Sequence, residues 1–374
     1  MTLERPDDLA DVEDGAACFV PGAQPPATHR VVAEIPVGLG PEGAIVDAQR
    51  RRAYVTSSRA HALTVVDLER LEPLGEIPVG REPTDIALDT RANRVFVCDL
   101  RGSTISVVDI PSQRVLRTVS VPGYPASVAL DEPRRLLYCG CAAGSAVAII
   151  DVDSLELLAT VPAEPGAGGI AFAARRGRIY CANFLSDSVT VVDIESQAPA
   201  GRLDVGRAPC AMIVSGRNDS AYVANSASDS VTRIDLAHQR PAAEIPVGRG
   251  PVGINLAPGG DRVYVGNRAE GTISVIGIDD DREWGRIPVG EAPAGSAVDP
   301  DTGWLLISNA GSATLTVIDD LLTGPLENQP ATAAHPLVGE RVPAFALPDL
   351  RSARVRRTRE WDGRKYILHF FASW

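Results

Sequence analysis

A single 42-residue period runs through most of this sequence and restricts the possible folds more than any other feature. Seven equivalent positions, each 42 residues after the last, hold a large apolar residue: Tyr54, Phe96, Tyr138, Tyr180, Tyr222, Tyr264 and Leu306. An aspartate keeps the same spacing at Asp67, Asp109, Asp151, Asp193, Asp235 and Asp319, with Gly277 in the sixth place. Seven copies without an insertion are typical of a repeat architecture in which each copy is one supersecondary unit.

Each copy contains four segments with the character of β-strands. In the sixth copy they are residues 251–256, 262–265, 272–276 and a last segment that ends in Ile-Pro-Val-Gly at 287–290. β-Branched and aromatic residues suit a pleated sheet, and the segments between them are rich in turn-forming residues. A period of about 40–45 residues with four strands predicts a β-propeller blade. Helical repeats would show a 3.6-residue periodicity, which is not seen here.

The two ends of the repeat array predict how the ring closes. The seventh copy has three strand-like segments, near 293–298, 304–308 and 313–318, and lacks a fourth. A further strand-like segment, 31–37, precedes the first copy. If it completes the seventh blade, no sheet edge is left unpaired between the ends of the array. We therefore expect an all-β fold: a seven-bladed β-propeller over residues 29–321, with its last blade closed by the N-terminal strand.

The repeats resemble those of a known family. The sequence reads Tyr-Val-Ala-Asn at 222–225 and Tyr-Val-Gly-Asn at 264–267, and Ile-Pro-Val-Gly recurs at the end of the fourth segments. These motifs are similar to those of the YVTN family of β-propeller repeats, and the resemblance covers residues 30–320. It implies a fold and leaves the activity open, because such propellers include surface proteins, electron-transfer partners and many binding scaffolds.

The charge of the chain excludes two classes of partner. There are 36 basic and 48 acidic residues, whereas binding to nucleic acid or to an anionic membrane surface requires a basic face. No apolar run approaches the roughly 20 residues that span a bilayer. Residues 1–14 hold six carboxylates and one arginine, unlike a signal peptide, so we expect a cytoplasmic protein. An incomplete N-terminus would leave a periplasmic or extracellular location open. We expect residues 1–28 to form a flexible acidic tail.

Residues 322–337 have the composition of a linker, and the sequence changes character after them. Residues 338–374 resemble the start of a thioredoxin-like redoxin domain of the thiol-disulfide oxidoreductase or alkyl hydroperoxide reductase type. The matching positions are Gly339, Pro343, Phe345, Leu347, Asp349, Gly363, Lys365 and Phe370 to Trp374. In that family this last strand leads into a catalytic Cys-x-x-Cys, which would follow Trp374. The resemblance implies an incomplete thioredoxin-like α/β segment, and thiol-disulfide or peroxide reduction by a full-length protein.

The cysteines do not form a recognisable reactive motif. The six are Cys18, Cys98, Cys139, Cys141, Cys181 and Cys210. They show no C-x-x-C pair and no zinc-like spacing. Four of them replace other residues within repeat strands, so we expect buried free thiols. A disulfide between the equivalent Cys139 and Cys181 of neighbouring blades would need Cα atoms within about 7 Å, which we do not expect. We assign no catalytic residue, metal ligand or cofactor.

Ligand-binding residues of a propeller are expected where one blade departs from the others. By this criterion the candidates are Arg233, Tyr124, Phe184 and Cys210. Arg233 is the strongest, because it stands where six sister blades have Val or Ile. His61 and His238 lie in different blades, so we expect no shared metal site. Asparagines that recur at the end of the second strands are interpreted as part of the scaffold.

Three functions are compatible with the sequence. The first is a binding or interaction scaffold, a rigid disc that presents loops to a protein or small-molecule partner and is fused to a redoxin in the full-length protein. The second is a propeller enzyme of the lactonase or sugar-dehydrogenase type, which requires a cluster of carboxylates, Asn or His around a metal in the central channel. No such cluster stands out. The third is a surface-exposed structural repeat protein. We expect the first, as a monomer without nucleic-acid or membrane partners.

Overall fold

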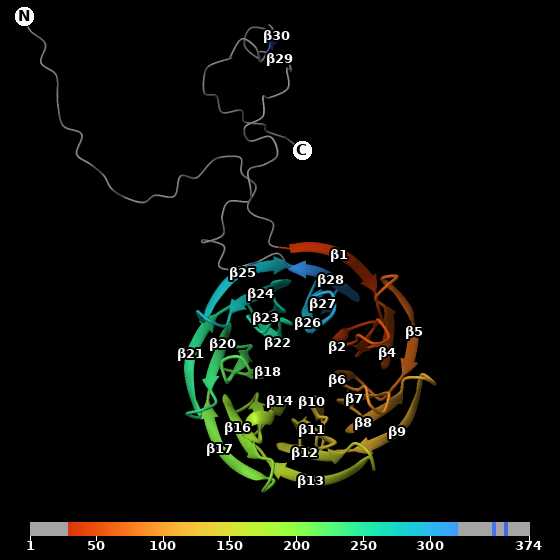
Figure 1. The fold of residues 1–374 in the computed structure, drawn as a ribbon, viewed down its shortest axis with the longest axis vertical. Helices are drawn as coiled ribbons and strands as arrows, with labels where there is room; N and C mark the ends of the chain where they lie inside the picture. Colours follow the sequence, from red (N-terminus) through yellow and green to blue (C-terminus); the bar gives the residue numbers. More distant parts are fainter. Residues whose placement is uncertain (1–28, 321–345, 349–354, 358–374) are drawn as a thin grey trace, which may run out of the picture. The chain divides into compact units, whose positions relative to one another are not determined.

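The computed structural model describes residues 29–320 and two short strands, 346–348 and 355–357. Residues 29–320 form seven four-stranded antiparallel sheets, the blades, which surround a central axis (Figure 1). The helical content of these residues is one 3-10 turn, η1 (Ala174–Arg176). None of the described residues belongs to a helix that is long and apolar enough to cross a membrane. The predicted seven-bladed, all-β architecture is confirmed.

The strands of each blade follow one another from the axis to the rim. The innermost strands are β2 (Pro41–Asp47), β6 (Pro83–Asp89), β10 (Pro125–Asp131), β14 (Ala167–Ala173), β18 (Pro209–Ser215), β22 (Pro251–Leu256) and β26 (Pro293–Val298). The second strands are β3 (Arg52–Ser57), β7 (Arg94–Asp99), β11 (Leu136–Cys141), β15 (Arg178–Asn183), β19 (Ser220–Asn225), β23 (Arg262–Asn267) and β27 (Leu305–Asn309). The third strands are β4 (Ala62–Asp67), β8 (Thr104–Asp109), β12 (Ala146–Asp151), β16 (Ser188–Asp193), β20 (Ser230–Asp235), β24 (Thr272–Gly277) and β28 (Thr314–Asp320). The outermost strands are β5 (Glu72–Pro78), β9 (Arg114–Ser120), β13 (Glu156–Pro162), β17 (Ala198–Asp204), β21 (Arg240–Pro246), β25 (Arg282–Pro288) and, in the seventh blade, β1 (His29–Pro36).

Local turn chemistry explains the regular hairpins of each blade. In the fifth blade, Asp229 and Gln239 end two of the turns with φ of 51° and 52°, in the left-handed region. This region is sparsely populated by residues other than glycine, and aspartate is among the side chains that enter it most readily. Asp235 accepts hydrogen bonds from the backbone N–H groups of Ala237 and His238, at 2.9 and 3.1 Å, and so caps the turn that follows β20.

The N-terminal strand closes the ring. β1 pairs antiparallel with β28, with His29 opposite Asp320 and Ile35 opposite Leu315, and completes the seventh sheet in the order β1-β28-β27-β26. The Ile35 side chain is fully buried between the last and first blades. The predicted closure by an N-terminal strand is confirmed.

The repeated residues pack within and between the blades. The aromatic series, at Tyr54, Phe96, Tyr138, Tyr180, Tyr222 and Tyr264, is buried throughout. The repeated asparagines lie inside the hairpins: Asn225 Nδ2 donates hydrogen bonds to Ser230 Oγ at 3.2 Å and Thr232 Oγ1 at 2.9 Å. These residues therefore hold the second and third strands together, as expected of scaffold residues.

Antiparallel pairing gives the disc two different faces. The turns between second and third strands lie on the same side as the links from one blade to the next, and hydrogen bonds such as Ser58 N–H to the Gly40 carbonyl join them. We call this the link face. The turns between first and second strands and between third and fourth strands lie on the other side, which we call the turn face.

Outside the propeller, the structure describes β29 (Ala346–Pro348) and β30 (Val355–Arg357), which pair antiparallel with Leu347 opposite Arg356. The expected acidic tail (1–28) and linker (322–337) lie outside the described residues. So do the redoxin-like positions of 338–374 beyond these two strands.

Candidate functional site

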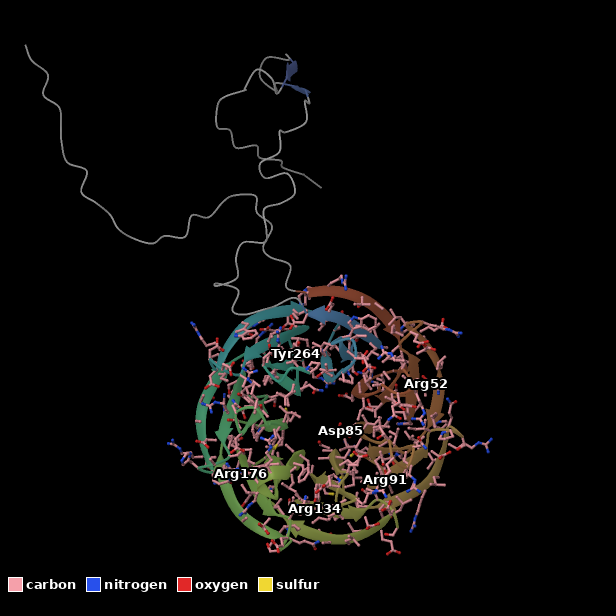
Figure 2. The ribbon with its side chains drawn as sticks, viewed as in Figure 1. Arg52, Asp85, Arg91, Arg134, Arg176 and Tyr264 are labelled. Atoms are coloured by element: carbon pink, nitrogen blue, oxygen red, sulfur yellow. The ribbon has the colours of Figure 1, made fainter. Side chains whose placement is uncertain are left out.

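A central channel of about 650 Å³ runs along the propeller axis and is lined by residues of the innermost strands. In Figure 2, Asp85 lies beside the central opening, whereas Arg176 and Arg134 lie farther out in the ring. Because the strands that form the wall are hydrogen-bonded within seven packed blades, the wall is rigid. Residues at equivalent repeat positions therefore face the channel at fixed places.

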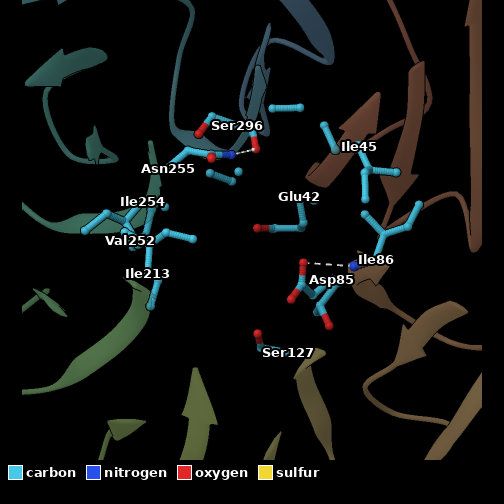
Figure 3. Close-up of a pocket in the computed structure, with 18 of the residues that line it drawn as sticks. Glu42, Ile45, Asp85, Ile86, Ser127, Ile213, Val252, Ile254, Asn255 and Ser296 are labelled. Atoms are coloured by element: carbon cyan, nitrogen blue, oxygen red, sulfur yellow. Dashed lines mark hydrogen bonds between the residues drawn. The ribbon is translucent and has the colours of Figure 1, made fainter. Parts of the chain in front are cut away.

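The channel wall combines polar and apolar side chains, and four of the polar ones lie on the first three blades. The polar side chains of the first three blades are Glu42, Thr84, Asp85 and Ser127. Partly exposed apolar side chains come from the fifth and sixth blades, at Ile213, Val252 and Ile254, and also from the first blade, at Ile45. Asn255 and Ser296 add a polar contact between the sixth and seventh blades, because Asn255 Nδ2 donates to the Ser296 carbonyl at 2.9 Å (Figure 3). The seven-fold symmetry of the scaffold is thus broken inside the channel.

Asp85 is a carboxylate at the channel surface without an ion-pair partner among residues 29–320. One oxygen accepts the backbone N–H of Ile86 at 2.8 Å, and the other accepts that of Val128, in the next blade, at 3.0 Å. Glu42, Asp85 and Ser127 project into the channel from adjacent blades (Figure 3). Burial raises the pKa of Asp85 above its ordinary value, although the Ser127 hydroxyl and the two backbone donors oppose that shift.

Glu42 is neutralised by an arginine that reaches across a whole blade. Arg268 follows β23 on the link face, and its guanidinium donates to both carboxylate oxygens of Glu42, at 3.0 and 3.2 Å. This bidentate contact raises the pKa of Arg268. Arg268 also borders a second hollow of about 510 Å³ between the sixth and seventh blades, which Glu34, Glu270 and Glu291 line. Arg268 therefore lines both the channel and the outer hollow.

Cys210 is the predicted site residue that the structure places in the channel wall. Its Sγ lies 3.3 Å from the Pro251 carbonyl oxygen and is half-buried. Burial raises its pKa to about 12. A thiol in this state holds its proton at neutral pH, and the thiolate is the nucleophilic form of cysteine. Cys210 therefore lacks the lowered pKa of an activated nucleophile.

The other three predicted residues lie elsewhere. Tyr124 and Phe184 are exposed on the link face, by 38% and 45%, and the Arg101 guanidinium stacks over the Tyr124 ring at 5.0 Å. Arg233 forms an ion pair with Asp281 of the next blade, at 2.7 Å, so its departure from the repeat has a structural partner. The four candidates do not form one site, and their role in ligand binding stays a prediction.

The cysteines of the second to fourth blades are free thiols. Cys98, Cys139, Cys141 and Cys181 are all buried, as expected, and the Sγ atoms of Cys139 and Cys141 lie 4.0 Å apart. Cys18 falls outside the described residues. Because these thiols sit in the apolar core between blades, they behave as small hydrophobic side chains.

The donor set does not fit a channel metal. Nowhere in the described part of the chain do three His, Cys, Asp or Glu side chains converge to hold an ion. The two histidines weighed as metal ligands have local partners: His61 Nδ1 accepts the Glu82 N–H at 3.1 Å, and His238 Nδ1 lies 2.7 Å from an Asp235 oxygen. A metal-dependent mechanism therefore gains no support from this channel.

Glu42, Asp85 and Arg268 escaped the sequence-based search, although a signal was present. Glu42 aligns with Ala126, Val252 and Ala294 of other blades, and Asp85 aligns with five residues that are Gly or Ala. Acidic residues recur at the turns of almost every blade, and this background obscured Glu42 and Asp85. Comparing only the positions that follow the repeated proline would have separated them.

Comparisons with known proteins agree with this architecture. The family model described as "Lactonase, 7-bladed beta-propeller" matches residues 150–337, half of the chain. A search of curated proteins gives no match. Among solved structures, a chain of Kuenenia stuttgartiensis hydrazine synthase is similar, with a TM-score of 0.70 at 17% identity over 75% of this chain and 96% of that chain. Such low identity shows a common fold alone, and 1645 solved chains match, so the fold indicates no single activity. From the family match and its seven observed blades, the chain belongs to the lactonase family of seven-bladed β-propellers.

Proposed function

We propose that this protein is a binding scaffold that holds a small molecule in its central channel. The observation that supports the proposal is the mixed lining of the channel: hydrogen-bonding groups on blades one to three lie across from the partly exposed apolar side chains of Ile213 and Ile254 on blades five and six (Figure 3). Pockets for small molecules have volumes of about 300–1,000 Å³ and combine apolar walls with a few convergent polar groups. The channel, of about 650 Å³, has both properties.

The test is a ligand screen on the whole 374-residue chain, with one variant that fills the channel. Saturation-transfer-difference NMR would examine water-soluble fragments that include amines, polyols, amides, lactones and carboxylates. Ala126→Phe introduces a ring at the channel wall, and Ala227→Phe introduces the same ring at an exposed position of the link face. The proposal expects fragments that bind the wild type and the Ala227 variant and lose binding in the Ala126 variant. Fragments that bind all three proteins equally would refute it.

A second candidate is lactone hydrolysis, which the family match and Asp85 favour. A carboxylate with a raised pKa at a channel surface suits a general base, here one that accepts the proton of a water molecule attacking the lactone carbonyl. The assay is ring opening of a neutral sugar lactone above the spontaneous rate. Asp85→Asn should abolish that activity, whereas Asp204→Asn, the same change at an exposed position of β17, should retain it. Absence of activity in the wild type removes the candidate.

The fusion to a redoxin belongs to the same proposal. Its support is the resemblance of residues 338–374 to the start of that domain. In this arrangement the propeller would position a substrate or partner for thiol chemistry. Reading the gene beyond codon 374 tests it directly, and a continuation without a Cys-x-x-Cys or a peroxidatic cysteine would end it.

A further inference from the structure

Within this proposed binding function, we infer that the channel selects a small organic cation, a primary ammonium or amidinium carried on an apolar body. The inference begins with the charges that line the channel. Of the described side chains in its wall, three are charged: Glu42, Asp85 and Arg268. Glu42 and Arg268 neutralise each other through a two-fold contact. The negative charge of Asp85 therefore has no ion-pair partner among the described residues of the wall, and a cationic group of a bound molecule can neutralise it.

Asp85 is held in place to receive such a group. An ionised carboxylate offers about four acceptor positions, and the Ile86 and Val128 N–H groups occupy one on each oxygen. The Ser127 hydroxyl lies beside the carboxylate and lowers its pKa. At least one acceptor position therefore stays available, and the carboxylate is fixed between two blades. A charge-assisted hydrogen bond from an ammonium is stronger than one from a neutral donor.

The opposite wall defines the rest of the ligand. Ile213, Val252 and Ile254 present an apolar surface on the far side of the channel from Asp85 (Figure 3). A hydrated inorganic cation gains nothing from such a surface, whereas an aromatic or branched aliphatic group buries its apolar area there. An anion, by contrast, would have to displace Glu42 from both of its hydrogen bonds to Arg268. The two walls together favour an amine with an apolar body over a carboxylate of the same shape.

Three isosteric probes test the inference on the wild-type 374-residue chain: benzylammonium, benzyl alcohol and benzoate. Isothermal titration calorimetry at neutral pH and low salt should show benzylammonium binding about tenfold more tightly than benzyl alcohol, and benzoate more weakly than both. If benzyl alcohol binds and benzylammonium binds no better, the inference fails and channel binding stands. If benzoate binds most tightly, the inference fails in the same way. If no probe or screened fragment binds, the proposed function fails with it.

A matched pair of variants locates the charge that matters. Asp85→Asn should reduce the preference for benzylammonium over benzyl alcohol to about twofold or less, while benzyl alcohol binding persists and reports a folded channel. Asp204→Asn removes the same charge from an exposed position at the end of β17 and should leave the preference unchanged. An equal loss in both variants would show a general electrostatic effect and overturn the assignment to Asp85.

Discussion

Closure of the ring by β1 leads to a prediction about two outermost strands: β25 follows its partner through a hairpin turn, and β1 does not. Ile35 in β1 and Ile287 in β25 are equivalent residues of outermost strands, and both side chains are fully buried. Ile35 packs between the seventh and first blades and Ile287 between the sixth and seventh. Replacing either by Ala removes the same atoms from the same depth, so each variant should lose about 2–5 kcal/mol of unfolding free energy.

The two variants should differ in how the blades open locally. β25 is joined to β24 by a short turn. No turn joins β1 to β28, because the two strands come from opposite ends of the array, and they are held by their pairing and by the ion pair of Arg30 with Asp319. Weakening Ile35 therefore allows β1 to detach and expose β28 without unfolding the remaining blades. Hydrogen exchange measured by mass spectrometry should accelerate strongly in β28 of Ile35→Ala. It should change little in β24 of Ile287→Ala. Equal acceleration in the two strands would refute this reasoning.

Three further predictions concern the charged residues. Arg135→Met leaves the fully buried Asp89 without the guanidinium that lies 3.0 and 2.6 Å from its two oxygens. The unfolding free energy measured in urea should fall by about 3–5 kcal/mol, and a loss near zero would contradict this prediction. Burial alone would raise the pKa of Asp89, but Arg135 and a backbone donor hold it below its ordinary value. The resulting stability is full above about pH 4 and should be lost as pH falls through the lowered pKa. The Arg135→Met variant should lack this pH dependence of the unfolding free energy. Arg268→Ala removes the partner of Glu42 and leaves a second uncompensated carboxylate in the channel. Calorimetry should then show benzylammonium binding about threefold or more tighter. An unchanged affinity would show that Glu42 does not face the ligand.

The fold was predictable because each of its determinants is local and repeated. Strand and turn residues recur every 42 positions, so seven weak signals add up, and the unmatched strand at 31–37 leaves one way to complete the ring. Ile35 opposite Leu315 confirms a pairing between residues 280 positions apart. It could be predicted because the array had one vacant strand and one unassigned strand.

The site was less predictable because it depends on which side chains meet across the axis. Arg268 reaches Glu42 across the seventh blade, where the small residues Ala294 and Gly295 lie near the start of β26. Repeat spacing does not reveal that path. Arg233 was selected for breaking the repeat, yet its partner is Asp281, 48 residues away in the next blade. A departure from symmetry thus marks either a scaffold contact or a channel residue, and the three-dimensional structure is needed to distinguish them.

Asp85 connects the stability of the propeller with its proposed ligand. Because burial raises its folded-state pKa, the folded protein binds its proton more tightly than the unfolded chain does, and stability falls as pH rises through the raised value. The nearby Cys98 thiol does not titrate in this range, since burial raises its pKa as well. A bound cation compensates the ionised form only, so the thermal shift produced by benzylammonium should grow from about pH 4 to pH 8, where the amine itself stays protonated. The shift produced by benzyl alcohol should stay flat over that range. A benzylammonium shift that is equally flat, or that persists in Asp85→Asn, would show that this carboxylate does not hold the ligand.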